Sequence, residues 1–342
     1  MLTIRMYSSA GKVAGQGVGS AYSELIALLE KHYPTELNLI VNRFGSADIS
    51  HYHTIDPQFY LSTFSKRVGR KIGYVHFLPE TMAGSLQLPG GLMKIFNAYM
   101  ISFYKRMDQL VVVNPSFGAK LTALGIPAEK ITYIPNFVSK KEFYPLKASQ
   151  KAQLRQKHGI AANKFTVIGV GQVQARKGLF DFIKLAHQLP ECQFIWVGGF
   201  SFGKMTDGYE ELKKVVDDPP ANLLFPGIVD RKQMNEYYNL ADLFLLPSYN
   251  ELFPMSVLEA FSCEVPVLLR DLDLYHSIIS GYYEPAADVE EMRQKISELQ
   301  TDAVALSHLQ TKAAAAAAYY NEDRLAQVWH DFYTEQAKLG RR

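Results

Sequence analysis

The chain has 342 residues, of which 48% are hydrophobic and 20% charged, with 23 Gly and 16 Pro. This composition excludes a disordered chain, a collagen and a coiled coil, and the length predicts two domains of about 150 residues each. The net charge of +2 gives no indication of nucleic-acid binding. It is unevenly spread, however: residues 1–145 carry 15 Lys and Arg against 9 Asp and Glu, or +6, and the remainder carries 21 against 25, or −4. The basic first half is therefore expected to face an anionic partner.

Short apolar runs alternate with amphipathic stretches along the first half. Parallel strands covered by helices have this pattern. The strands expected there span residues 2–7, 37–43, 49–53, 72–77, 109–113 and 131–134. The helices expected between them span 19–32, 57–70, 91–106 and 116–124.

The pattern restarts after a polar, helix-like stretch at 146–163. Strands are expected at Phe165–Gly171, Gln193–Val197, Asn222–Phe225, Leu243–Leu246 and Val265–Leu269. Helices are expected at 177–188, 208–217, 231–240, 255–262 and 288–299, and only helices after residue 300. The sequence thus predicts an α/β fold of two Rossmann-like domains, residues 1–145 and 146–322.

Cysteine content and hydropathy bear on the compartment. Cys192 and Cys263 are the two cysteines, too few for a disulfide framework. The N-terminus has no signal-peptide pattern, and no window of about 18 uninterrupted apolar residues occurs. We expect a cytoplasmic protein without a membrane span.

Gly15, Gly17 and Gly19 lie between the first strand and the first helix. Glycines at such a turn let backbone N–H groups approach a phosphate. The G-x-G-x-G spacing misses the dinucleotide fingerprint, which argues against a nicotinamide cofactor. The alternative is a flexible turn.

A basic pair, Arg176 and Lys177, follows the strand Phe165–Gly171. Two cations at a helix N-terminus oppose the helix dipole, so a bound anion would stabilise them. A diphosphate fits, with Arg176 forking its oxygens and Lys177 acting as a point charge. The alternative is a solvated basic loop.

Two carboxylates, Glu251 and Glu259, follow the strand Leu243–Leu246. Pro254 suits the first turn of the helix that carries Glu259. A rise of 1.5 Å per residue separates the carboxylates by roughly 10 Å, too far to share a proton and suited to holding two parts of one long ligand. Backbone N–H groups near Phe253 could hold phosphate oxygens. The alternative is that both acids are solvated.

We expect no metal site. Asp271 and Asp273 follow a strand, but an N-cap is the simpler interpretation. His51 and His53 alternate on one strand without a visible third ligand, and we interpret both as ordinary polar positions.

Together these segments resemble the retaining glycosyltransferases of family 4, which have the GT-B fold. The resemblance covers nearly the whole chain. It includes Tyr74–Pro79, Ile134–Val138, Gly171–Gly178, Leu223–Val229 and the E-x7-E pair Glu251/Glu259. It implies two Rossmann-like domains facing across a cleft, with the C-terminal helix, about 323–342, crossing back to the first. Phe137 and Leu252 depart from the family by replacing glycines, and the second departure bears on the identity of the sugar.

The resemblance also implies roles for individual residues. Arg176 and Lys177 would bind the donor diphosphate, while Glu251 would contact the transferred sugar. Glu259 would hold the ribose, and His76 would lie at the reaction centre. The remaining donor-binding positions would be Gly17, Val229, Phe253, Pro254 and Met255.

Basic residues in the first half suggest the acceptor. They are Lys66, Arg67, Arg70 and Lys71 in one cluster, and Lys94, Lys105 and Arg106 beside the aromatic residues of 91–106. Cations flanking apolar and aromatic residues suit a helix at an anionic lipid surface. The alternative is that the apolar residues face the domain core.

With the N-terminal segment included, the chain is similar to bacterial glycolipid synthases of this family that add a second hexose to monoglycosyl-diacylglycerol. This implies α-retaining transfer of a hexose from UDP-glucose or UDP-galactose to a glycolipid, by a peripheral enzyme on the inner face of the cell membrane. No metal or other cofactor is expected. A soluble, polysaccharide or protein-glycan acceptor, and a non-catalytic sugar-nucleotide-binding protein, remain as alternatives.

Overall fold

The computed structural model of the chain describes residues 1–10, 17–76, 78–79, 90–201, 203, 206, 208–251 and 253–340. These residues form two compact units. The first unit contains the described residues up to Phe137 together with the helix that begins at Glu322, and the second runs from Val138 to Asn321. Each unit is built on a six-stranded sheet whose pairs are all parallel, which confirms the predicted fold class.

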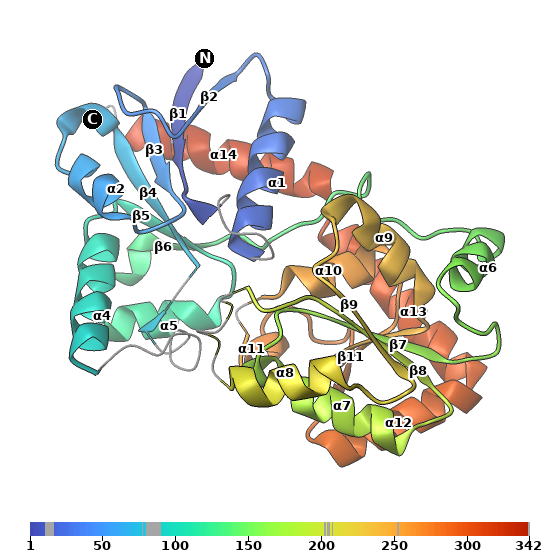
Figure 1. The fold of residues 1–342 in the computed structure, drawn as a ribbon. Coiled ribbons are helices and arrows are strands. Elements are labelled where there is room, and N and C mark those ends of the chain that lie inside the picture. The colour runs from blue at the N-terminus through green and yellow to red at the C-terminus, as the bar shows by residue number, and fades with distance from the viewer. Residues whose placement is uncertain are drawn as a thin grey trace. The chain divides into compact units, whose positions relative to one another are not determined.

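The first unit has the strand order β2-β1-β3-β4-β5-β6 (Figure 1). Ile4 of β1, the second strand from the edge, pairs with Leu39 on one side and with Ile49 on the other. The strands are β1 Leu2–Tyr7, β2 Leu37–Val41, β3 Ile49–Tyr52, β4 Arg70–Val75, β5 Gln109–Val112 and β6 Ile131–Tyr133. The helices are α1 Gly17–His32, α2 Pro57–Ser62, α4 Gly90–Lys105, α5 Ser116–Ala123 and the C-terminal α14 Glu322–Gly340.

Helices cover both faces of this sheet. On β3, His51 contacts Tyr333 of α14, whereas the next residue, Tyr52, packs edge-on against Phe103 of α4. Successive side chains of a strand point to opposite faces, so α14 and α4 lie on opposite sides. Helix α14 also packs beside α1, at the other end of the chain (Figure 1). The predicted return of the C-terminal helix to the first unit is therefore confirmed.

The second unit has the strand order β12-β11-β10-β7-β8-β9. Its strands are β7 Thr166–Val170, β8 Gln193–Val197, β9 Leu223–Gly227, β10 Leu243–Leu246, β11 Val267–Arg270 and β12 Glu284–Ala286. Its helices are α6 Ala148–Lys157, α7 Leu179–Gln188, α8 Tyr209–Asp217, α9 Arg231–Leu240, α10 Met255–Ser262, α11 Asp273–His276, α12 Val289–Thr301 and α13 Ala303–Tyr319. The alanine run of α13 allows close packing with α10, since Ala313 and Ala316 are fully buried.

The predicted helix over 57–70 is wrong in its second half. Helix α2 ends at Ser62, a single 3₁₀ turn spans Lys66–Val68, and β4 has begun by Arg70. Gly69 lies between them with φ +64°, a left-handed conformation that ends the turn. The basic residues of this segment are therefore divided between a turn and a strand.

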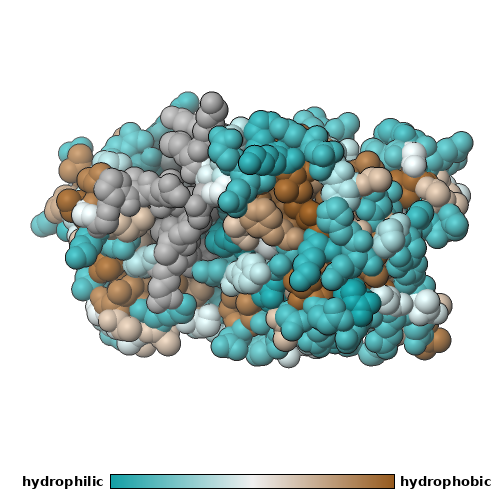
Figure 2. Space-filling model, turned by 60° about the horizontal axis from the view of Figure 1, so that its bottom comes forward, coloured by the Kyte–Doolittle hydropathy of each residue, from teal (hydrophilic) through white to brown (hydrophobic). Residues whose placement is uncertain are grey.

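The hydropathy of the surface and of the helices is relevant to contact with a membrane. On the face that Figure 2 shows, apolar side chains form separate islands within a hydrophilic surface. Among the described helices, none combines the length and the apolar character that a membrane crossing requires.

Candidate active site

Loops that leave the carboxyl ends of β7, β8 and β10 converge in the second unit. A Cβ on Gly178, which has φ +74°, would lie 2.1 Å from the carbonyl oxygen of Pro247. A Cβ on Gly198, with φ +141°, would lie 1.9 Å from the carbonyl oxygen of Gly171. Only glycine permits these approaches, so the three loops form one surface at the edge where open α/β sheets bind ligands.

Lys177 and Glu251 join two of these loops through a buried ion pair. Lys177 Nζ lies 2.5 Å from Glu251 Oε1, and the hydroxyl of Ser248 donates to the same oxygen at 2.6 Å. Glu251 is 7% exposed, which excludes the solvated alternative for this acid. Arg176 strengthens the junction, since its Nη1 donates to the carbonyl oxygen of Asn250 at 2.7 Å. The structure thus brings Arg176, Lys177 and Glu251 together, as the sequence predicts.

The electrostatics of the pair follow from its burial. Burial by itself raises the pKa of the Glu251 carboxyl, but the charges of Lys177 and Arg176 and the hydrogen bonds from Lys177 and Ser248 lower the pKa below its ordinary value. Burial lowers the pKa of Lys177; the charge of Glu251 opposes this, and the charge of Arg176 adds to it. Removing one partner of a buried ion pair leaves an uncompensated charge and costs about 3–5 kcal/mol.

Arg176 also presents a donor to this surface. Within the described part of the chain, its Nε is a buried nitrogen without a hydrogen-bond partner. Buried polar atoms rarely stay unsatisfied in folded proteins, and a guanidinium N–H is a strong donor to an anionic oxygen. The arrangement can therefore donate a hydrogen bond to an anionic oxygen, such as that of a phosphate.

Glu259 lies on α10 and is held from two sides. The hydroxyl of Tyr238 donates to its Oε2 at 2.6 Å, and Arg231 Nη1 lies 2.9 Å from its Oε1. Arg231 also pairs with Glu142, at 3.1 Å, and stacks over the ring of Phe143. Sequence reasoning missed both Tyr238 and Arg231, because neither belongs to a recognisable motif.

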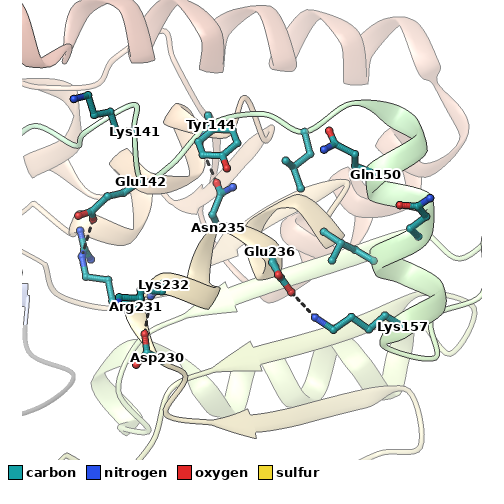
Figure 3. Close-up of a pocket in the computed structure, with 13 residues that line it drawn as sticks. Lys141, Glu142, Tyr144, Gln150, Lys157, Asp230, Arg231, Lys232, Asn235 and Glu236 are labelled. Atoms are coloured by element: carbon teal, nitrogen blue, oxygen red, sulfur yellow. Dashed lines mark hydrogen bonds and ion pairs between the residues drawn. The ribbon is translucent and has the colours of Figure 1, made fainter.

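A pocket of about 820 Å³ borders Arg231, between the segment that leads into α6 and helix α9 (Figure 3). Two contacts join the residues that line the pocket. Lys157 Nζ lies 2.8 Å from Glu236 Oε2, and the N–H of Tyr144 donates to Asn235 Oδ1 at 2.9 Å. The pocket thus lies next to the residue that holds Glu259.

The other predicted donor residues lie on neighbouring loops. Pro254 caps α10 directly before Met255, and Phe253 is 4% exposed. Val229 follows β9 and is half-buried, next to Ile228, which is 56% exposed and lies against Gly199. Leu252 lies outside the described residues.

In the first unit, His76 directly follows β4 and is 7% exposed. Its ring stacks on Tyr74 at a centroid distance of 4.3 Å, and its Nε2 lies 3.5 Å from His53 Nδ1. The Tyr74 hydroxyl donates to Asn136 Oδ1 at 3.0 Å, which ties the two predicted motifs of this unit together. Burial lowers the pKa of His76 to about 3.

The interpretation of His51 and His53 as ordinary polar positions is wrong. Both side chains are buried, with ring centroids 4.2 Å apart, and His51 Nδ1 lies 2.7 Å from the Tyr333 hydroxyl. Burial, together with the charge of His76, lowers the pKa of His51 to about 3, and burial places the pKa of His53 well below the ordinary value. Their alternation on one strand could have indicated a shared buried face.

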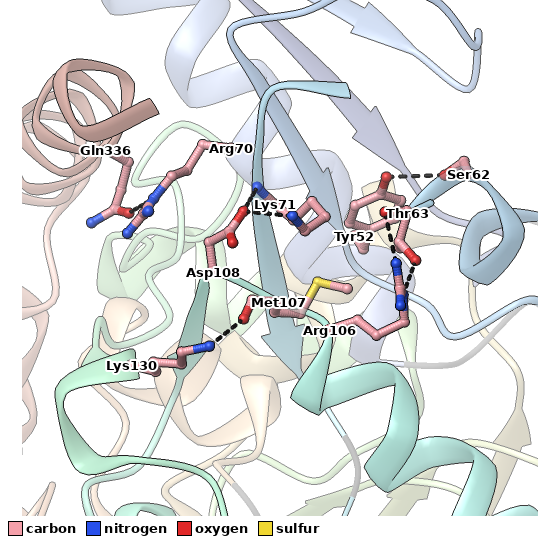
Figure 4. Close-up of polar contacts among 10 residues, drawn as sticks. All are labelled: Tyr52, Ser62, Thr63, Arg70, Lys71, Arg106, Met107, Asp108, Lys130 and Gln336. Carbon is pink, nitrogen blue, oxygen red and sulfur yellow. Dashed lines mark hydrogen bonds and ion pairs between the residues drawn. The ribbon is translucent and has the colours of Figure 1, made fainter. Parts of the chain in front are cut away.

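The predicted basic surface of the first unit is divided by the fold. Lys71 pairs with Asp108 at 3.0 Å, and Arg70 Nε donates to Gln336 of α14 (Figure 4). Arg106 is half-buried, donates to Thr63 Oγ1 at 2.6 Å and stacks on Phe64. The exposed cations of the set are Lys66, Arg67, Lys94 and Lys105.

Gly17 begins α1, but Gly15 lies outside the described residues, so the loop before this helix is not described. Asp271 pairs with His276 at 2.7 Å and does not cap α11. In the described part of the chain no group of three His, Cys, Asp or Glu side chains is placed to hold a metal ion.

Comparison with solved structures defines the class of fold. HepE from Anabaena, solved in complex with UDP-glucose, superposes with a TM-score of 0.79 at 16% identity, over 98% of this chain and 100% of that one. The two parallel α/β units are those of the GT-B glycosyltransferases.

Comparison of sequences then gives the family. The model of "Glycosyltransferase Family 4" matches residues 22–142, and that of "Glycosyl transferases group 1" matches residues 150–317. Alpha-galactosylglucosyldiacylglycerol synthase from Streptococcus pneumoniae is 55% identical over 342 residues, 100% of this chain and 91% of that protein. Processive diacylglycerol alpha-glucosyltransferase from Acholeplasma laidlawii is 28% identical over 51% of this chain and 53% of its own length. The chain belongs to glycosyltransferase family 4, whose members transfer a glycosyl group from a nucleotide sugar.

The histidine cluster predicts that the first unit loses stability in mild acid. Unfolded histidines titrate near pH 6.5, whereas His51 and His76 in the fold have pKa values of about 3. Below pH 6.5 the unfolded chain therefore binds protons that the folded chain does not. The free energy of unfolding consequently decreases as the pH is lowered. The expected loss is about 1.4 kcal/mol per pH unit for each histidine.

Urea unfolding followed by tryptophan fluorescence between pH 6 and pH 5 measures this loss. The chain has two tryptophans, so a Trp196→Phe background leaves Trp329 of the first unit as the reporter. His51→Gln in that background should remove one histidine's share of the slope. An identical slope with and without His51 would contradict the prediction.

Proposed function

We propose that this enzyme transfers glucose or galactose from a UDP-sugar to a monoglycosyl-diacylglycerol, with retention of the α configuration. The observation that carries the donor half is the constellation of Arg176, Lys177 and Glu251 at the carboxyl edge of the second sheet. The acceptor half is supported by the full-length relative at 55% identity, whose name describes a diacylglycerol carrying two hexoses.

The cations of this constellation suit a diphosphate leaving group. Arg176 offers the unpartnered Nε, and Lys177 exchanges Glu251 for a phosphate oxygen when the donor binds. Preorganised donors aimed at a developing negative charge stabilise the transition state without reorganisation. With two cations in place, the proposal requires no metal ion or other cofactor.

Glu251 then faces the transferred sugar. Once Lys177 neutralises the phosphate, the carboxylate accepts hydrogen bonds from sugar hydroxyls and lies beside the positive charge that develops as the anomeric bond opens. The bond from the anomeric carbon to the diphosphate breaks, and a bond to the acceptor oxygen forms on the same face. The acceptor proton passes to the departing phosphate oxygen, so the configuration is retained.

Glu259 would hold the ribose of the donor. Arg231 and Tyr238 fix its carboxylate, which can accept further hydrogen bonds from a pair of vicinal hydroxyls. The base would then lie along Val229 and the exposed Ile228, next to Gly199. The backbone of Phe253, Pro254 and Met255 would contact the phosphates at the start of α10.

His76 acts in this account as a neutral hydrogen-bonding group. A pKa of about 3 leaves its imidazole uncharged at neutral pH, so it orients a hydroxyl of the donor sugar or the acceptor and does not carry a proton. Stacking on Tyr74 holds the ring in place. On the same unit, Gly17 would let the first loop approach the diphosphate or the acceptor.

An exposed apolar and basic surface on the first unit supports a lipid acceptor. Leu61 and Phe64 are 69% and 60% exposed, and Leu92 and Ile95 of α4 are 54% and 68% exposed. The segment of Leu61 packs along α4, since the hydroxyls of Tyr60 and Ser102 lie 2.9 Å apart. We define these four apolar residues, with Lys66, Arg67 and Lys94, as the lipid-facing surface.

This lipid-facing surface would hold the enzyme peripherally on the inner, anionic face of the cell membrane. The apolar side chains enter the interface, and each exposed cation contributes about 1 kcal/mol of attraction to anionic lipid. Arg106 donates to Thr63 and stacks on Phe64, and Arg70 and Lys71 make contacts within the unit, so these three contribute less.

Turnover of a UDP-hexose tests the donor site. Arg176→Ala and Glu251→Ala should each lower UDP release with monoglucosyl-diacylglycerol by about 10²–10³-fold, because each removes a preorganised contact to the reacting group. UDP-glucose and UDP-galactose are both supplied, and a chelator should leave the rate of the wild type unchanged.

Lys213→Ala is the matched control, since Lys213 pairs with Asp217 on the exposed helix α8. It should turn over like the wild type. Unchanged turnover in both Arg176→Ala and Glu251→Ala would contradict the assignment of the donor site.

Vesicle flotation tests the lipid-facing surface. The wild type should float with vesicles that contain anionic lipid and bind less to zwitterionic ones. Replacing Lys66, Arg67 and Lys94 with Ala should weaken binding by about 3 kcal/mol, or roughly 150-fold.

The matched control replaces three lysines of the second unit, Lys184, Lys213 and Lys214, with Ala and should float like the wild type. A wild-type protein that stays in solution with both kinds of vesicle would rule out the membrane-bound state.

A further inference from the structure

Tyr275 is a buried tyrosine that no motif singles out. It lies on the four-residue helix α11, and its side chain is fully buried. Among the atoms of the described residues, its hydroxyl has no hydrogen-bond partner. A buried hydroxyl in this state destabilises the free protein, so its presence suggests a partner that arrives with a ligand.

The fold places helix α11 at the same edge of the sheet as the proposed donor site. Strand β11 pairs in parallel with β10, with Leu269 opposite Leu246, so the chain leaves both strands at the same edge of the sheet. Arg270, the last residue of β11, contacts the segment that follows β10, because its Nε donates to the carbonyl oxygen of Pro247 at 3.1 Å. Its Nη2 pairs with Asp181 of α7. Helix α11 therefore begins beside the loop that carries Glu251.

The charges around Tyr275 agree with this placement. Burial raises the pKa of its phenol, the carboxylate of Glu251 raises the pKa further, and the guanidinium of Arg176 lowers it. The hydroxyl is therefore protonated at neutral pH. It can therefore donate a hydrogen bond.

We propose that the Tyr275 hydroxyl donates a hydrogen bond to an oxygen of the transferred hexose, beside Glu251. A sugar hydroxyl both donates and accepts, and a carboxylate can only accept from it. Tyr275 supplies a hydrogen-bond donor that Glu251 lacks, so the two residues together recognise one or two hydroxyls of the sugar. In the proposed function, the cations Arg176 and Lys177 bind the diphosphate. The neutral donor Tyr275 is therefore left to recognise the sugar. The inference rests on the proposed function of the site.

The isosteric variant Tyr275→Phe tests this assignment. Titration calorimetry compares the binding of UDP with that of UDP-glucose and UDP-galactose. The variant should bind UDP within about twofold of the wild type, and should bind the UDP-hexose it turns over about tenfold more weakly. Its Tm without ligand should equal or exceed that of the wild type, because the unsatisfied hydroxyl is gone.

Tyr283→Phe is the matched control. Its ring packs edge-on against Tyr275 with centroids 5.8 Å apart, so it tests whether packing alone affects binding, and UDP-hexose affinity should be unchanged. Equal UDP-hexose affinity in Tyr275→Phe and the wild type would overturn the assignment, as would an equal loss of UDP and UDP-hexose binding. A wild type that fails to bind UDP would instead overturn the proposed function, and this inference with it.

Discussion

The buried ion pair between Lys177 and Glu251 is the interaction on which the donor site depends. It joins the loops after β7 and β10, which carry the groups that would meet the two ends of a sugar–diphosphate bond. Gly178 allows the backbones to meet, and Ser248 completes the partners of the carboxylate. In the free protein the pair satisfies two charges that would be costly to bury alone. In the proposed function, a bound diphosphate would offer Lys177 a second anionic partner and would release Glu251 toward the sugar.

The first unit relies on neutral rings where the second relies on charge. Three histidines are buried there, and burial keeps their pKa values far below neutral pH. Stacking with Tyr74 and contact with Tyr333 hold them in place, so the orientation of His76 depends on α14, the last helix of the chain. Under the proposed function, this arrangement would suit an uncharged acceptor, and the exposed apolar residues would suit the lipid part of that acceptor.

Much of this could be predicted from the sequence, because buried parallel strands are short apolar runs. Gln193–Val197 and Leu243–Leu246 have the predicted bounds, and the motif residues Arg176, Lys177 and Glu251 come together as expected. The features that the sequence did not predict depend on tertiary contacts. Strand β12, Glu284–Ala286, has no apolar run and exists through pairing with β11, and α11 is too short to show a period. The histidine cluster lies on a face of the sheet that α14 covers. This helix comes nearly 300 residues later in the chain, so a local sequence pattern cannot reveal the cluster.

The most direct measurement of the central claim is the product formed from each donor and acceptor pair. UDP-glucose or UDP-galactose is incubated with monoglucosyl-diacylglycerol in vesicles, and the anomeric configuration of the new linkage is read from the ¹H NMR spectrum of the lipid. We expect a diglycosyl lipid whose second hexose is α-linked, formed from one of the two donors. A β-linked product, or transfer to soluble acceptors with none to the glycolipid, would contradict the account.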